Sequence, residues 1–299
     1  MTPREERAAA QALTVPVAWP TLALAAGLVV FHLGLIALAL SGLVPLWAAV
    51  VPLGVSAYAH YTLVHESVHG NVVRGSAPAH AALGWYGSLV LGLTWPVLRR
   101  THQQHHSHTN AEADPDRFVH GSFCRVLLLA LRLGLSVLLP WVLLRRIVPD
   151  TEPLKPYLAA EEWMTTGERR VHYAVQTLLV GTVWGLMITG FWAEVLALYV
   201  LPGLIGRTLL MVLFQWWPHR PFEGRGRYDA TRYGYLGSEP LWLAQNLHLM
   251  HHLWPAVPWY NYARLRRALA PVLAERGAIH RPWPAMRGEG GRAREARPS

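Results

Sequence analysis

Histidine is the residue type that could carry chemistry in this sequence, and half of the sixteen histidines fall into three short motifs. The motifs are H-E-S-V-H, H-Q-Q-H-H and H-L-M-H-H, and they contain His65, His69, His102, His105, His106, His248, His251 and His252. If these segments are helical, spacings of three and four residues place the imidazoles of each motif on one helix face. Imidazole suits Zn, Cu, Fe and Ni, whereas Ca²⁺ and Mg²⁺ prefer oxygen ligands. One metal ion cannot use eight imidazoles, so the motifs predict a site with two metal ions.

The first motif alone also fits a zinc metalloprotease, in which His65 and His69 would bind Zn²⁺ and Glu66 would be the general base. Such a site needs one zinc ion and three protein ligands, which leaves the other two motifs unexplained. A non-catalytic metal-binding or transport protein is a further alternative, but its histidines should lie inside membrane spans rather than at their ends. Of the remaining histidines, His32 is interpreted as a helix–helix hydrogen bond or a tunnel residue, and His60 is left open. The isolated ones are expected to be structural or exposed: His80, His120, His172 and His280.

The composition points to a membrane protein. Hydrophobic residues make up 52% of the 299 residues and charged residues only 15%, against about 25% charged in soluble domains. The net charge of +9 comes almost wholly from arginine, because Lys155 is the only lysine. These arginines stand in pairs at the ends of apolar runs, which indicates lipid headgroups or an acidic protein partner and argues against nucleic acid. The single cysteine, Cys124, excludes an internal disulfide and a cysteine-based metal site.

Four apolar stretches are long enough to cross a bilayer as helices, since twenty residues at about 1.5 Å each cover its ~30 Å core. They lie at 21–40, 43–64, 171–192 and 194–217. Weaker stretches at 81–98 and 126–144 are expected to be interfacial or re-entrant. The predicted fold is an all-α integral membrane protein with four transmembrane helices in two hairpins. A helical cap would carry the histidine-rich dinuclear site. We expect 1–280 to be a single domain and 281–299 to be a disordered tail.

The ligands of one site must lie on one side of the membrane, which constrains the topology. Two hairpins bring the first and third motifs out on the side of the N-terminus. The second motif joins them only if 81–98 does not cross, whereas six full spans would put the first two motifs on opposite faces. His219, at the end of the last span, emerges at the same depth and is predicted as a ninth ligand. Arginine pairs at 99–100, 145–146 and 169–170 fall on this side, which the positive-inside rule makes the cytoplasm, here at the cell inner membrane.

Metal-binding imidazoles need hydrogen-bond acceptors that hold them in one tautomer. Four polar residues near the motifs are candidates for that role: Glu66, Asp114, Asp116 and Asn246. The alternative for each carboxylate is a helix cap or a surface ion pair.

The order of the three motifs, each beside paired membrane helices, resembles the membrane fatty acid desaturase and hydroxylase superfamily over roughly residues 20–275. Three stretches are similar to β-carotene hydroxylases of the desaturase-like type: H-T-N-A-E-A-D-P-D-R-F at 108–118, W-P-H-R-P-F-E at 217–223 and H-L-M-H-H-L-W-P-A-V-P-W-Y at 248–260. The resemblance implies a di-iron centre on the eight motif histidines and His219, with O₂ as co-substrate. It implies electrons from a separate ferredoxin or similar carrier. It also makes His108 a neighbour of the ligands rather than a ligand.

The expected function is O₂-dependent oxidation of an unactivated C–H bond in a lipid-like substrate. The resemblance favours hydroxylation of a β-carotene ring, as in carotenoid biosynthesis. Desaturation of an acyl lipid would use the same ligands, so the histidines alone cannot separate the two reactions. A basic surface around the cap is expected to steer an acidic electron carrier. Its residues would be Arg99, Arg100, Arg220, Arg225, Arg227 and Arg232.

Overall fold

The computed structural model describes residues 1–149, 154–234, 239 and 241–278 of the chain. This described part is helical, with one isolated bridge between Val17 and Val73 and no strand. The all-α class is therefore confirmed. The expected disordered tail at 281–299 and the isolated His280 both lie outside the described residues.

The first pair of long helices is formed by α2 (Trp19–Leu40) and α3 (Leu46–Val68), which pack against each other. A short turn joins them, in which Gly42 has a φ of 78°. The outward face of α2 exposes large apolar side chains such as Val30 and Phe31. Exposed apolar side chains on a long uncharged helix are typical of a lipid-facing surface.

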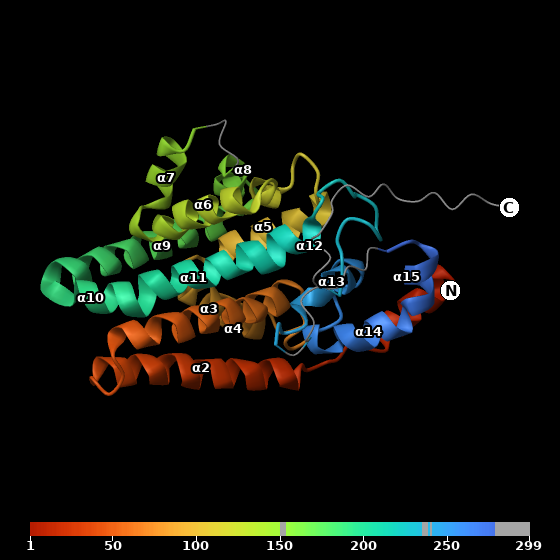
Figure 1. Ribbon diagram of the computed structural model, residues 1–299, viewed down its shortest axis with the longest axis horizontal. Helices are drawn as coiled ribbons and strands as arrows, with labels where there is room; N and C mark the ends of the chain where they lie inside the picture. The colour runs from red at the N-terminus through yellow and green to blue at the C-terminus, as the bar shows by residue number, and fades with distance from the viewer. Residues whose placement is uncertain (150–153, 235–238, 240, 279–299) are drawn as a thin grey trace.

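The second pair comes from a helical stretch of 54 residues, Thr166–His219. It comprises α9 (Thr166–Leu186), α10 (Trp192–Val195), α11 (Leu201–Leu210) and α12 (Trp217–His219). Three π-helical segments join them, at Met187–Phe191, Leu196–Val200 and Met211–Trp216. The chain reverses at Gly190, whose φ of 105° only glycine adopts readily. Figure 1 shows α9 and α11 meeting at this reversal beside α10. The turn predicted near 192–194 thus lies two residues earlier.

Two described helical stretches, α2 and Thr166–His219, are long and apolar enough to cross a membrane. The second contains both predicted spans at 171–192 and 194–217. A third candidate is the pair α4 (Ala77–Val90) and α5 (Trp95–His108), which bends by 101° at its break. A bent pair of this kind is either a broken span or the re-entrant path expected for 81–98. α3 has 23 residues but carries His60, His65 and Glu66 in its second half, which makes it less apolar than α2.

The stretch at 126–144, expected to be interfacial, is divided between α6 (Phe123–Gly134) and α7 (Trp141–Ile147). A 3-10 turn at Leu135–Leu138 and Pro140 separate them, so neither is long enough to span. Together with α8 (Lys155–Leu158) and 3-10 turns at Pro115–Val119 and Ala159–Trp163, they lie beside α9 and α11 (Figure 1).

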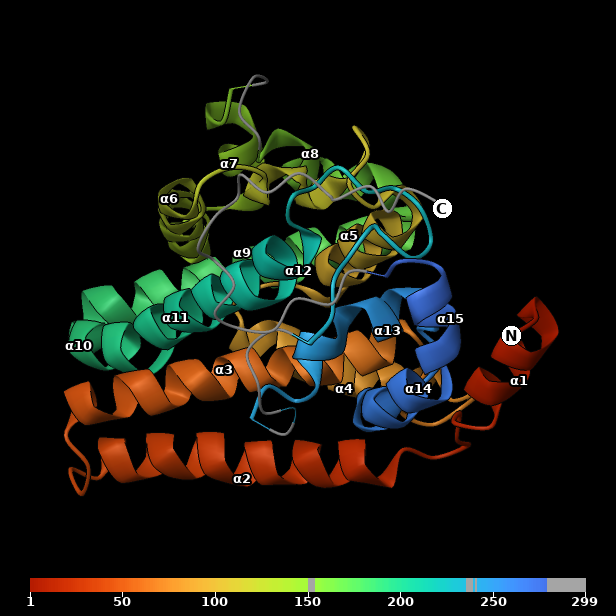
Figure 2. The same cartoon turned by 45° about the vertical axis from the view of Figure 1, so that its right-hand side comes forward.

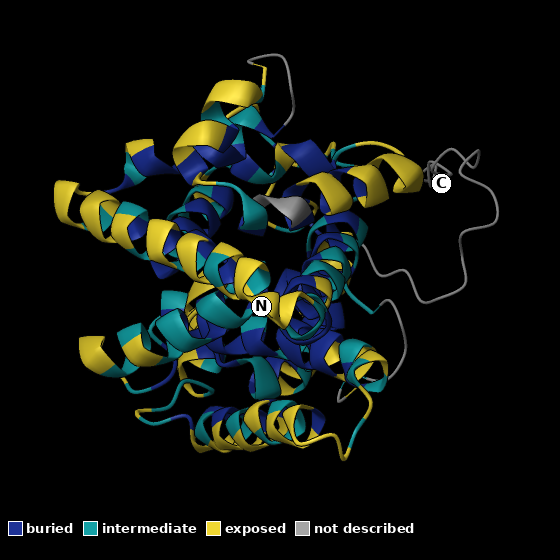
Figure 3. Ribbon diagram, turned by 90° about the vertical axis from the view of Figure 1, so that its left-hand side faces the viewer, coloured by how far each residue is buried: buried dark blue, intermediate teal, exposed yellow. Residues whose placement is uncertain are grey.

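A cap of short helices gathers at one end of both long pairs (Figures 1 and 2). It consists of α1 (Pro3–Gln11), α13 (His248–Leu253), α14 (Tyr262–Ala268) and α15 (Ala270–Glu275), with 3-10 turns at Gln245–Leu247 and Trp259–Asn261. These elements share a buried apolar core that includes Leu249, Met250 and Tyr262. In Figure 3 exposed residues cover the outer helix faces around a buried interior. His248 and His251 of the third motif are buried.

Close packing of α11 on α3 brings the two long pairs together. A side chain at Gly206 would collide with α3, because its Cβ would lie 2.7 Å from the Cβ of Ala57 and 3.0 Å from the backbone N of Tyr58. Small residues allow this approach between membrane helices. Consequently the C-terminal end of α3, which carries the first motif, lies near the end of the second pair, which carries His219.

Candidate metal centre

Nine histidines from four elements meet where the cap joins the long helices. Within the described residues, their nitrogens form two groups of four that could each hold a metal ion. The first histidine group is His65, His69, His102 and His251. The second histidine group is His105, His219, His248 and His252. The three motifs and the predicted ninth histidine are therefore brought together in one place.

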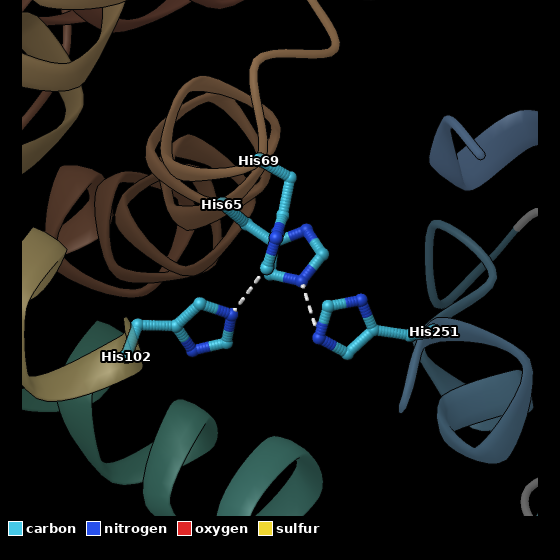
Figure 4. A group of neighbouring side chains, drawn as sticks. All are labelled: His65, His69, His102 and His251. Carbon is cyan, nitrogen blue, oxygen red and sulfur yellow. Dashed lines mark hydrogen bonds between the residues drawn. The ribbon is translucent and has the colours of Figure 1, made fainter. Parts of the chain in front are cut away.

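Figure 4 shows how three elements build the first histidine group. His65 lies in the last turns of α3 and His69 caps its C-terminus, while His102 comes from α5 and His251 from α13. The four rings point toward one another. His65 Nε2 lies 3.0 Å from His251 Nε2, and His69 Nε2 lies 2.8 Å from His102 Nε2.

The second histidine group depends on His219, which α12 places against α13. His219 Nε2 lies 3.0 Å from His248 Nε2, and His248 Nε2 lies 3.1 Å from His252 Nε2. His105 Nε2 of α5 is 3.4 Å from His252 Nε2. Without His219 this group would have three nitrogens where the first group has four.

Helical geometry explains why the second and third motifs each serve both groups. At 100° per residue, the first two histidines of H-x-x-H-H diverge by about 60° around the helix axis, and the two adjacent ones by about 100°. His102 therefore faces the first group while His105 faces the second, and on α13 His251 and His252 separate in the same way. His106 remains between them, with its Nε2 2.6 Å from His251 Nε2 and its ring stacked on His252.

These nitrogen–nitrogen distances fit metal coordination. With bonds of about 2.1 Å, two imidazoles bound at 90–109° to one metal ion have nitrogens about 3.0–3.4 Å apart. Most neighbouring Nε2 atoms within the two groups lie at or close to that separation. Buried nitrogen lone pairs that face one another repel unless a cation lies between them. An all-imidazole donor set of this kind suits a transition metal.

Carboxylates hold two of the imidazoles in the orientation that metal binding requires. His65 Nδ1 lies 3.2 Å from Glu66 Oε1, and the other oxygen of Glu66 accepts the N–H of Trp259. His105 Nδ1 lies 2.9 Å from Asp114 Oδ1, and Asp114 also accepts backbone N–H groups from 110 and 116. With a proton on Nδ1 of each ring, the Nε2 lone pair faces the metal group.

The other residues predicted to support the ligands lie differently. Asp116 Oδ2 is 3.7 Å from His105 Nδ1, too far for a hydrogen bond. His108 Nδ1 contacts the carbonyl of Gln104 in its own helix rather than a ligand. Asn246 is buried in the turn before α13, where its backbone carbonyl accepts the N–H of Gly234.

Two tyrosines also contact the ligands, and sequence reasoning missed both. Tyr61 Oη lies 3.4 Å from His102 Nδ1, and Tyr262 Oη lies 3.2 Å from His251 Nδ1. Tyr61 is one helical turn before His65 on α3, which was a usable signal. Tyr262 belongs to a separate helix, and nothing in its spacing relates it to the third motif.

Burial keeps the cap histidines in the form that binds metal. Loss of solvation, followed by the charges of neighbouring histidines, holds the pKa of His248, His251 and His252 well below the usual histidine range. These imidazoles are therefore neutral at physiological pH, with a lone pair available.

The remaining described histidines lie outside both groups. His32 Nδ1 is 3.1 Å from Ser56 Oγ, which is a contact between α2 and α3 of the kind expected for it. His60 Nδ1 contacts the carbonyl of Ser56 in its own helix. His172 is buried against Thr94, and His120 stacks on the ring of Phe222.

A small cavity adjoins the first histidine group, with a volume of about 40 Å³. His102 and Tyr61 lie at its border with the metal groups, and apolar side chains such as Leu93, Leu133 and Leu210 form much of its wall. Its polar lining includes Asp116, Gln215 and Arg207. An apolar space beside a metal group can hold a hydrocarbon close to the reacting centre.

The arrangement has a counterpart among known families. A model of the family "Fatty acid desaturase" matches residues 41–284, which is most of the chain. The chain belongs to the fatty acid desaturase family. The superfamily resemblance of the three motifs is thus confirmed, and this family member is an oxidoreductase of the desaturase type.

Several known proteins are similar to this family member in sequence. It is 28% identical over 217 residues to "Beta-carotene ketolase" from Paracoccus sp. (strain PC1), covering 69% of this chain and 73% of that protein. A second "Beta-carotene ketolase", from Paracoccus sp. (strain N81106 / MBIC 01143), is 27% identical over 219 residues with the same shares. "Probable fatty acid desaturase DES1" from Sorghum bicolor is 23% identical over 247 residues, covering 74% of this chain and 62% of that protein.

Proposed function

We propose that this protein oxidises an unactivated C–H bond of a carotenoid with O₂, at two iron ions held by its nine clustered histidines. The observation that carries the proposal is the pair of adjacent histidine groups, each able to surround one metal ion. The zinc protease alternative is not favoured. It needs three ligands for one ion and a free Glu66, whereas Glu66 is buried and engaged with His65 and Trp259.

The chain's own residues have three tasks in this reaction. The first and second histidine groups would each hold one iron, with His106 between them, and the iron pair would supply the O₂ reduction that makes C–H oxidation possible. Glu66 and Asp114 keep His65 and His105 oriented. The apolar part of the cavity wall would exclude water and hold the reacting part of the substrate close to His102.

A carotenoid ring is the substrate that the relatives favour, because two of them are named beta-carotene ketolases. One oxygen insertion converts C–H to C–OH and consumes one O₂, two electrons and two protons, releasing one water. A second insertion at the same carbon gives a geminal diol, which loses water to leave a ketone. Hydroxylation, the reaction suggested by the sequence, would thus be the first step of either outcome.

Acyl-lipid desaturation is the second candidate, favoured by the likeness to the sorghum protein named as a desaturase. It would use the same histidines but remove two hydrogens from neighbouring carbons, with both oxygen atoms released as water. The two reactions differ in the product and not in the ligand set.

We further propose four transmembrane helices in two hairpins, with the histidine cap at the cytoplasmic face of the inner membrane, and a ferredoxin or similar carrier as electron donor. Arginines around the cap support this orientation. Of the surface expected for the carrier, Arg225 is exposed, and Arg227 is exposed but pairs with Glu6 at 2.9 Å. Arg232 is buried, and Arg100 pairs with Glu168 at 2.7 Å. The contact surface would therefore be smaller than the sequence suggests.

The proposal is tested by expressing the protein in cells that make β-carotene and separating the pigments by chromatography. The expected result is a hydroxylated or keto carotenoid that is absent with His251→Ala, which removes a ligand of the first histidine group. Unchanged β-carotene together with new double bonds in membrane acyl chains would favour the desaturase instead. Neither product, in cells where an electron donor is supplied, would contradict both.

A further inference from the structure

Arg207 is a buried cation in the middle of the apolar helix α11. Its side chain is 3% exposed. One nitrogen, Nη2, donates to the backbone carbonyl of Gly134 at 2.7 Å. The other two nitrogens, Nε and Nη1, have no hydrogen-bond partner among the described residues. The backbone contact thus uses one part of the guanidinium and leaves the rest available.

Arg207 lies at the cavity that borders the first histidine group, because Arg207 and His102 line the same cavity. Phe214, seven positions further along the helix, packs its ring on His248 at 4.6 Å between centroids. At about 1.5 Å per residue, the backbone positions of Arg207 and Phe214 are roughly 10 Å apart along the helix. Gly92 makes room for Arg207, because a Cβ there would lie 3.2 Å from Nη1.

The buried guanidinium of Arg207 needs a hydrogen-bond partner or an anion to offset the cost of its burial. Asp116 lines the same cavity, but within the described residues no carboxylate lies within ion-pair distance of Arg207, and much of the wall is formed by Leu93, Leu133 and Leu210. Burying a charge in an apolar medium is costly unless hydrogen bonds compensate it. Ionisable residues inside membrane segments accordingly mark binding sites or relays more often than structural positions.

We propose that Arg207 donates a hydrogen bond to an oxygen of the substrate. The protein would then select, among lipid-like chains, those that carry a carbonyl or carboxyl oxygen. This inference rests on the proposed oxidation at the histidine groups and narrows its substrate class. Arg207 would hold the chain by that oxygen at the same cavity that His102 borders. A pure hydrocarbon such as β-carotene would leave the guanidinium unpaired.

Two kinds of molecule could supply the oxygen, and they share this chemistry. One is an isoprenoid with a β-ring and a shortened polyene ending in an aldehyde, and the other is an acyl chain with its ester carbonyl. Turnover of both is compared with that of β-carotene in detergent-purified holoenzyme. Arg207→Met removes the donor with little change in length, and Arg207→Lys keeps a cation. Tyr199→Phe is the matched control, because it removes a nearby, partly buried hydroxyl that donates to the backbone carbonyl of Leu89.

The expected result is a wild-type preference for one carbonyl substrate over β-carotene. Arg207→Met should lower the ratio of their kcat/KM values on the order of 10- to 100-fold, the effect of one hydrogen bond to a charged group. Most of the loss should be in KM, Arg207→Lys should recover part of it, and Tyr199→Phe should leave the ratio unchanged. An equal loss for all substrates in Arg207→Met would mean that Arg207 only supports the fold, and would overturn the inference.

A second readout does not need turnover. The carbonyl stretching band of the bound aldehyde, measured by Raman spectroscopy, should shift to lower frequency in the wild type and in Arg207→Lys but not in Arg207→Met. An identical band in all three proteins would overturn the inference even if the enzyme is active. Conversely, a band shift without oxidation of any substrate would support the role of Arg207 and contradict the proposed function.

Discussion

Replacing His219 by alanine tests the membership of the second histidine group. His219 Nε2 lies 3.0 Å from His248 Nε2, and the group has four nitrogens with it and three without it. His106 is grouped with His251 and His252, one residue from each group, and not with His105 or His248. We therefore expect His219→Ala to lose one metal ion and essentially all activity.

The magnitude follows from the position of the residue. Removing a group that only orients a ligand weakens metal affinity about 10- to 100-fold, or roughly 1.4–2.7 kcal/mol. His219 points its Nε2 into the group itself, so its loss should exceed that range. The protein should still fold, because its other ring nitrogen, Nδ1, is buried and makes no hydrogen bond among the described residues.

Iron content per chain and turnover of detergent-purified protein are the assays. His120→Ala is the matched control, since His120 is also near the site but stacks on Phe222 and belongs to neither group. We expect normal iron and activity in His120→Ala, and about half of the iron in His219→Ala. Full iron content with near-normal turnover in His219→Ala would refute the reasoning and reduce the site to eight histidines.

Three further perturbations bear on the site and its cap. Asp114→Asn should lower iron affinity about 10- to 100-fold, measured by competition with a chelator, because His105 Nδ1 loses the carboxylate at 2.9 Å; an unchanged affinity would contradict the orienting role. Glu6→Ala should lower the free energy of unfolding by about 1–3 kcal/mol in thermal melts, because buried Glu6 accepts hydrogen bonds from Arg227 and Tyr228, and Glu6→Gln should lose less. Although burial alone would raise the pKa of Glu6, the hydrogen bonds from Tyr228 and Arg227 lower it. The stabilisation by ionised Glu6 is therefore present above the ordinary glutamate pKa and is lost as the pH falls through the lowered pKa of Glu6. The difference in the free energy of unfolding between the wild type and Glu6→Ala should therefore vanish in acid. Removal of metal by a chelator should lower the Tm, because ions that bind only the folded chain stabilise it; an unchanged Tm would show that the groups hold no tightly bound ion.

The sequence was most informative where helical periodicity relates the residues. Spacings of three and four residues predicted which face of α5 and α13 carries imidazoles. The requirement that all ligands lie on one side of the membrane predicted that the three motifs meet. His219 could be predicted from its place after Pro218 at the end of a helix. Asp114 was a candidate because it follows the second motif closely, and the structure brings it to His105.

Contacts between side chains of helices that are far apart in the sequence could not be predicted, because they depend on how those helices pack. The contact of Tyr262 with His251 follows from the way α14 folds back on α13. Arg207 lies inside an apolar run, and nothing in its sequence context relates it to the histidine motifs. The span count is another example. Reversal at Gly190 occurs within a helical stretch that continues on both sides, and α3 is less apolar than its partner because it carries the first motif. The break between the apolar runs at 171–192 and 194–217 indicated this reversal to within two residues, whereas local hydropathy does not explain why α3 carries polar residues.

Metal analysis of the wild-type protein, purified without oxygen and examined by Mössbauer spectroscopy, tests the central claim most directly. The two adjacent histidine groups predict two iron ions per chain in a single, magnetically coupled pair. One metal ion per chain, or zinc in place of iron in a protein that still oxidises its substrate, would contradict the account.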